Sequence, residues 1–153
     1  MLAYSDFLFR VVLALGLGAS IGVERQWRQR LTWLRTITLV LLGSTLFIAL
    51  ALRFAPPQGP SPFRVVAQII SSIGFLGAGV IMKEDLHVRV LKTAATLWCS
   101  TAVGSLCGMG CGAEALICTA AVVLVHLVLR PVGNQMDGRL IPAADVSRTH
   151  YLF

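Results

Sequence analysis

The fold is decided by the stretch Gly16-Leu-Gly-Ala-Ser-Ile-Gly22-Val-Glu24-Arg25-Gln-Trp-Arg28-Gln-Arg30, which is followed by Leu34-Arg35-Thr36. It contains the end of an apolar segment, a cluster of charges and the start of a second apolar segment. The same layout returns in Gly74-Phe-Leu-Gly77-Ala-Gly79-Val-Ile-Met-Lys83-Glu84-Asp85, which is followed by Leu91-Lys92-Thr93. Apolar segments joined by short charged loops are typical of helices that cross a membrane several times.

The composition agrees with this interpretation. The 153 residues are 56% hydrophobic and 13% charged, and the mean hydropathy is +0.79. Soluble domains usually carry about 25% charged residues, so the sequence predicts an integral membrane protein surrounded by the lipid bilayer. The net charge of +6 comes largely from lysines and arginines near the ends of apolar segments. Basic residues at such positions set topology, and we expect no nucleic-acid partner.

Five apolar segments reach or approach the length of a membrane-crossing helix, about 17 to 25 residues. They cover about residues 7–23, 36–52, 65–82, 93–109 and 115–129. Gly110 and Gly112 predict a tight turn between the last two segments. The sequence therefore predicts an all-α membrane protein, with a bundle of five transmembrane helices over residues 1–131 and a tail over residues 132–153.

The basic residues also predict an orientation. Ten lysines and arginines lie in residues 24–35, residues 83–92 and the end of the chain from Arg130, and three lie on the opposite side. Because the positive side of a membrane protein faces the cytoplasm, we expect a periplasmic N-terminus and a cytoplasmic C-terminus. An odd number of spans agrees with this arrangement. Arg10, at the start of the first span, is expected to extend toward the membrane surface.

An internal repeat is a further hypothesis. A shift of 57 residues places Gly22 on Gly79, Arg35 on Lys92 and Thr36 on Thr93. The first two spans and the next two would then form a parallel repeat. In each half the threonine would cap the N-terminus of the following helix.

Small residues predict where helices pack against one another. The first and fourth spans carry the GxxxG pairs Gly18/Gly22 and Gly104/Gly108, which allow two backbones to approach closely in lipid. The third span is rich in small and weakly polar residues, namely Gln68, Ser71, Ser72 and three glycines, so we expect it to face other helices. The alternative for Gly74–Gly79 is a local helix break that lines a transport cavity.

The polar residues argue against catalysis and, less strongly, against an ion pore. All seven acidic residues map to span ends, loops or the tail, whereas a carboxylate within a span would indicate an ion pathway. The four cysteines lie in or beside apolar segments without the spacing of a zinc site. We therefore expect a non-enzymatic protein without a metal or cofactor site.

Several motifs occur together in a recognisable order. They are Gly22–Arg30, Leu34-Arg35-Thr36, Ala67–Ser71, Ile73–Met82 and Thr93–Ser100. These motifs closely resemble the MgtC/SapB family over about residues 5–130. The resemblance implies a multi-pass protein of the bacterial inner membrane, with five spans and a cytoplasmic C-terminal domain. It also implies a role in growth at low magnesium and in survival inside phagocytes, which is a virulence trait.

The chain departs from the family pattern at four positions. Trp33 and Ser72 replace glycines, and Val90 and Lys92 replace the glycine and asparagine of a Gly-Leu-Asn motif. The last two changes put in doubt any role that the family assigns to that asparagine. We also expect the tail to be the start of a C-terminal soluble domain that is otherwise missing here, with Tyr151-Leu152-Phe153 as the start of a strand that is cut short.

The leading hypothesis is a regulator that binds other inner-membrane proteins, such as the F-type ATP synthase or a P-type ATPase, or further copies of itself. Small-residue helix faces and the loop around Arg25 and Arg28 would make the contacts. The main alternative is a transporter or channel for Mg²⁺ or another cation, with Glu24 or Asp85 at its mouth. A third hypothesis is a structural subunit of one complex. The functional candidates are Glu24, Arg25, Arg28, Arg35, Thr36, Gly74, Gly77, Gly79, Asp85, Lys92, Thr93 and Cys99.

Overall fold

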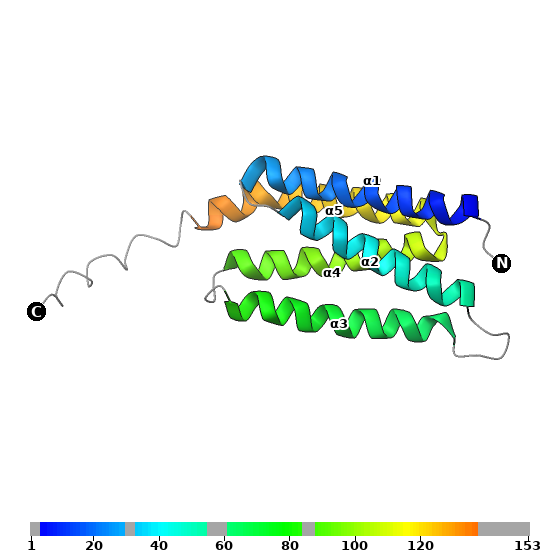
Figure 1. The fold of residues 1–153 in the computed structure, drawn as a ribbon. Helices are drawn as coiled ribbons and strands as arrows, with labels where there is room; N and C mark the ends of the chain where they lie inside the picture. The colour runs from blue at the N-terminus through cyan, green and yellow to red at the C-terminus, as the bar shows by residue number, and fades with distance from the viewer. Residues whose placement is uncertain (1–3, 30–32, 55–60, 84–87, 138–153) are drawn as a thin grey trace, which may run out of the picture. The chain divides into compact units, whose positions relative to one another are not determined.

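A computed structural model describes the backbone of residues 4–29, 33–54, 61–83 and 88–137, and the side chains of residues 4–24, 34–54, 61, 63–80, 82 and 91–128. Within these ranges the chain forms five α helices and no strand, which confirms the all-α prediction (Figure 1). The helices are α1 (Tyr4–Gln29), α2 (Trp33–Phe54), α3 (Pro62–Lys83), α4 (Val88–Met109) and α5 (Gly112–Asp137).

The chain divides into two compact units after Val122. The first unit contains α1 to α4 and the beginning of α5, and the second continues α5 from Val123. The predicted boundary at residue 131 between a membrane domain and a tail stays a prediction.

Three of the described helices are long and apolar enough to cross a membrane, over Tyr4–Glu24, Leu34–Phe54 and Phe63–Val80. The apolar part of α5, Gly112–Val128, is shorter. The predicted number of helices is confirmed within the described residues. Of these five helices, α1, α2 and α3 are supported as membrane spans by their length and composition. The orientation of the termini and the parallel repeat stay predictions.

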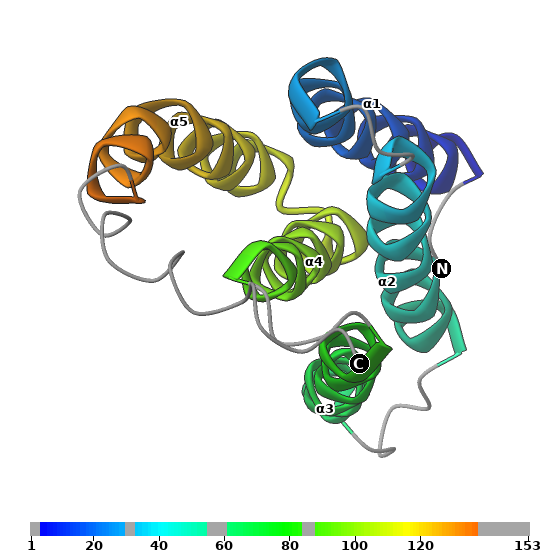
Figure 2. The ribbon, with the colours of Figure 1, turned by 90° about the vertical axis from the view of Figure 1, so that its left-hand side faces the viewer.

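The polar composition of α4 follows from its position in the first unit. It contacts α1, α2 and α3, and Figure 2 shows it facing both α2 and α3. Five hydroxyl side chains of α4 are buried: Thr93, Thr96, Ser100, Thr101 and Ser105. The hydroxyls of the last four donate to the carbonyl four residues earlier, at 2.8–2.9 Å. These bonds within the helix satisfy the hydroxyl donors, which lowers the cost of burying them in α4.

The first GxxxG pair holds α1 against α2, as predicted. A Cβ atom added at Gly18 would lie 3.0 Å from Thr38 Cα, and one added at Gly22 would lie 2.9 Å from Leu34 Cα. Neither distance leaves room for a side chain. Ile21 and Ile37 are buried at the same level of the unit.

The second GxxxG pair holds α4 against α2. A Cβ at Gly108 would lie 2.8 Å from both Ile48 Cβ and Thr45 O, and one at Gly104 would overlap the Leu41 carbonyl. The close approach allows Thr45 Oγ1 to donate to Gly104 O, at 2.8 Å, from a fully buried position. The prediction that this pair mediates helix packing is confirmed.

The expectation that the third span faces other helices is met on one side only. Ile73 is buried and Gly77 lies 3.6 Å from Ala94 Cβ across the contact with α4. Only 11% of the apolar span of α3 is buried, compared with 28% for α1 and 33% for α2. Gly74 and Gly79 lie in open space. The helix also passes through Gly74–Gly79 without interruption, so the predicted alternative of a helix break is wrong.

Candidate functional site

The charged segment after the first span is helical for longer than predicted. We expected a loop from Glu24 to Arg35, but α1 continues to Gln29 and α2 begins at Trp33. Glutamate, arginine and glutamine are good helix formers, so the helix persists after the apolar pattern stops. Glu24 is half-buried and Arg35 is exposed. Arg25 and Arg28 lie in the last turns of α1, and their side chains are outside the described set.

The predicted helix caps are also wrong. Thr36 is the fourth residue of α2 and Thr93 is the sixth of α4, so both lie inside their helices rather than at the cap position. Thr93 is buried, whereas Lys92 beside it is exposed. Asp85 lies outside the described residues, and Cys99 is half-buried in α4.

Arg10 forms a polar contact that the sequence did not predict. Instead of extending to the surface, its side chain is 12% exposed and donates from Nη1 to Gly108 O at 2.5 Å. Its Nη2 contacts Asp6 Oδ2 at 2.9 Å. The guanidinium therefore joins the first turns of α1 to the C-terminal end of α4, where a positive charge is favourable to the helix dipole.

The acceptor belongs to a Schellman motif that ends α4. Gly110 has φ of +86° and donates to Cys107 O, while Cys111 donates to Leu106 O, both at 3.0 Å. These are the two hydrogen bonds of that motif, and they confirm the predicted tight turn at Gly110. Glycine is needed at position 110 for this conformation, and a Cβ there would lie 2.8 Å from Arg10 Nη2, so that the end of the arginine side chain would have to shift.

The exposed side of α3 is the candidate interaction surface. At 100° per residue, seven residues between positions 68 and 82 fall on one stripe opposite the buried Ile73 and Gly77, and we call these seven residues the α3 face. Its members are Gln68, Ser71, Ser72, Phe75, Ala78, Gly79 and Met82, all exposed. Phe75 is 85% exposed and Met82 is 87% exposed.

The α3 face combines small residues with projecting ones. Ser72 Oγ donates to Gln68 O at 2.8 Å, so this hydroxyl is satisfied within the helix. A Cβ at Gly79 would meet no atom within 4 Å, so the glycine has no packing role in the first unit. Small residues on such a surface allow the backbone of a second helix to approach closely in lipid.

The predicted candidates do not form one site. Gly77 packs against α4, Gly74 and Gly79 lie on exposed parts of α3, and the described charged candidates lie near helix ends. Among the residues that the structure describes, no group of three or more His, Cys, Asp and Glu side chains is placed to hold a metal ion.

Comparison with known proteins identifies the family. The chain is 45% identical over 142 residues to Protein MgtC of Salmonella typhimurium and 52% identical over 121 residues to Protein MgtC of Brucella abortus. These alignments cover 93% and 79% of the chain, but only 60% and 50% of the relatives. An uncharacterized protein of Synechocystis is 44% identical over 149 residues, which are 97% of the chain and 62% of that protein.

The chain thus spans between half and about three-fifths of the length of these relatives. No solved structure matches it. The model of the MgtC family matches residues 11–135, a range that includes α3 and both GxxxG pairs. This chain therefore belongs to the MgtC family.

Proposed function

We propose that the chain regulates other proteins of the bacterial inner membrane by binding to their transmembrane helices through the α3 face. The observation that carries this proposal is the exposure of α3, whose apolar span is 11% buried, although its sequence is rich in the small residues that helix contacts use. Glycine and serine on a helix surface have no advantage in contact with lipid. In contact with a partner helix they allow the two backbones to approach closely.

The physiological part of the proposal is support of growth at low magnesium and of survival inside host cells. It rests on family membership and on the resemblance described above. The partners that we propose are large inner-membrane complexes, such as the F-type ATP synthase or a P-type ATPase. Arg25 and Arg28 would contribute a basic surface at the cytoplasmic end of α1.

A matched pair of substitutions tests the proposal. Gly79→Leu places a large side chain on the α3 face, and Gly16→Leu places the same side chain on the exposed surface of α1. A Cβ at either glycine meets no atom within 4 Å, so neither change disturbs the first unit. In a strain that depends on this protein at low magnesium, we expect Gly79→Leu to abolish growth and Gly16→Leu to preserve it.

The measurement requires that both variants reach the membrane in wild-type amounts. Wild-type growth of the Gly79→Leu strain would contradict docking through α3. The transport alternative has a separate test in liposomes that contain only this protein. Protein-dependent, saturable Mg²⁺ uptake would contradict a purely regulatory function, and we expect uptake equal to that of empty liposomes.

A further inference from the structure

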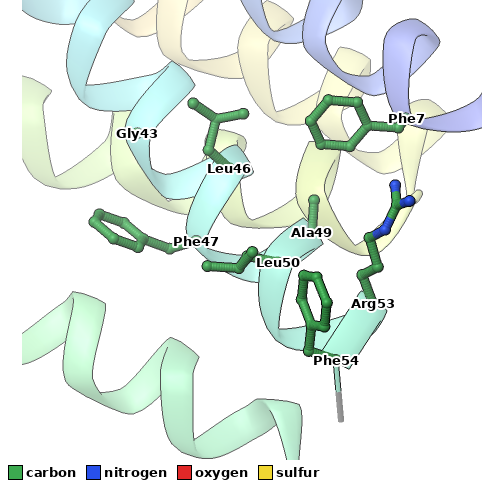
Figure 3. A pocket seen from close by; sticks show the side chains of 8 residues that line it. All are labelled: Phe7, Gly43, Leu46, Phe47, Ala49, Leu50, Arg53 and Phe54. Atoms are coloured by element: carbon green, nitrogen blue, oxygen red, sulfur yellow. The ribbon is translucent and has the colours of Figure 1, made fainter. Parts of the chain in front are cut away.

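A groove at one end of the first unit differs in character from the α3 face. It lies beside α2 and includes Phe7 of α1, and its volume is about 520 Å³, within the range of ligand sites in proteins. Its walls are formed by large apolar side chains, among them Phe47, Leu50 and Phe54 (Figure 3). Gly43 lines it as well. Partner helices favour small residues, whereas these walls offer aromatic and branched surfaces that suit a flexible hydrocarbon chain.

A positively charged side chain lies at the end of this groove. Arg53, the last residue but one of α2, lines the groove and reaches toward α1. Its guanidinium carbon lies 5.0 Å from the centre of the Tyr4 ring, a cation–π distance that holds the charge in place. Asp6, two residues after Tyr4 in α1, has its carboxylate bound to Arg10 at 2.9 Å.

The depth of Arg53 matches that of lipid head groups. Tyr4 and Phe54 begin and end two apolar spans of 21 residues each. At 1.5 Å per residue such a span is about 30 Å long, which is the thickness of the hydrocarbon core. Tyrosine is enriched at this interface. The apolar groove therefore lies at the level of acyl chains and the guanidinium at the level of phosphates.

We propose that this groove is a binding site for an anionic phospholipid. One acyl chain packs along Phe7, Phe47 and Leu50, and the phosphate accepts hydrogen bonds from Arg53. Guanidinium groups bind phosphate in a bidentate manner, which gives the site a preference for a head group with net negative charge. A zwitterionic lipid places its own cation near the arginine and binds more weakly.

Two matched pairs of variants distinguish the contribution of the head group to lipid binding from that of the acyl chain. Arg53→Gln removes the charge at the groove, and Arg64→Gln removes an exposed charge at the start of α3. Gly43→Leu fills the groove, since a Cβ there meets no atom within 4 Å, and Gly16→Leu is the same change outside the groove. The readout is lipid retention by the purified full chain, titrated with phosphatidylglycerol or phosphatidylcholine and measured by native mass spectrometry.

We expect the wild-type protein to retain phosphatidylglycerol in preference to phosphatidylcholine. Arg53→Gln should weaken phosphatidylglycerol binding about fivefold, the effect of one basic residue near a membrane surface, and should leave phosphatidylcholine unchanged. Gly43→Leu should weaken both lipids, and the two control variants should match the wild type. Equal retention of both lipids by the wild type, equal effects of the two arginine variants, or wild-type binding by Gly43→Leu would each overturn the proposal.

Discussion

Two glycines on α4 determine how closely it approaches α2. At Gly104 and Gly108 the backbones are so close that an added methyl group would overlap main-chain or Cβ atoms of α2. Main-chain atoms cannot move aside as a flexible side chain can. The approach also places Thr45 Oγ1 2.8 Å from Gly104 O, which adds a buried hydrogen bond to the contact. These residues therefore determine the stability of the first unit.

The substitution Gly104→Ala tests this interpretation. The new methyl group would push α2 and α4 apart, and overpacking of this kind costs about 1–3 kcal/mol. Gly16→Ala is the matched control, because its Cβ meets no atom within 4 Å. Unfolding of the purified protein in lipid bicelles should show a lower free energy of unfolding for Gly104→Ala only. Equal stability of the two variants would contradict the packing at Gly104.

Arg10 supplies a second residue-scale prediction. It donates to Gly108 O and contacts Asp6, and it is 12% exposed. Arg10→Gln should lower the free energy of unfolding by about 1–3 kcal/mol, because it leaves the Gly108 carbonyl without its charged donor. Arg64→Gln, which changes an exposed residue, should have little effect. A stability loss that is the same for both variants would show that Arg10 acts only through net charge.

At the scale of the element, α3 has one side that packs and one that does not. Ile73 is 8% exposed and faces the bundle, whereas Phe75, two residues later, is 85% exposed. The two sides of α3 should therefore have different roles, one in the stability of the first unit and the other in association with a partner protein. A residue on the packed side should affect folding, and a residue on the α3 face should affect binding to a partner.

The pair Ile73→Ala and Phe75→Ala makes this separation measurable. Ile73→Ala removes a buried side chain and should destabilise the protein by about 2–5 kcal/mol in bicelle unfolding. Phe75→Ala should leave stability within about 0.5 kcal/mol of the wild type but should weaken complex formation in native membranes. If Phe75→Ala were the more destabilising change, α3 would pack in a different rotation.

The helices themselves were largely predictable from hydrophobic segments, but their ends were not. The apolar pattern stops near Val23, whereas α1 continues to Gln29, because the charged residues that follow also favour helix. The starts of α2 and α4 also lie before the predicted caps, so Thr36 and Thr93 are inside their helices. The two GxxxG pairs were predicted as packing sites, since small residues on a membrane helix have few other uses.

At the scale of the whole molecule, the contacts between distant segments could not be predicted. Arg10 and Gly108 are 98 residues apart, and the sequence offered only the tight turn at Gly110 as a signal near that contact. The groove beside α2 likewise depends on where α1 places Phe7. The asymmetry of α3 was also missed, because a glycine-rich helix can face its own bundle or another protein with the same sequence pattern.

The proposed binding of another membrane protein by the α3 face can be tested in the cell membrane itself. The most direct test is site-specific photocrosslinking in native membranes, with the photoreactive residue at Phe75 on the α3 face or at Leu39 on α2. Both positions are well exposed, at 85% and 64%, so both should react with whatever surrounds them. We expect a discrete protein adduct from position 75 and lipid adducts alone from position 39. Lipid adducts alone from both positions would contradict the proposed binding.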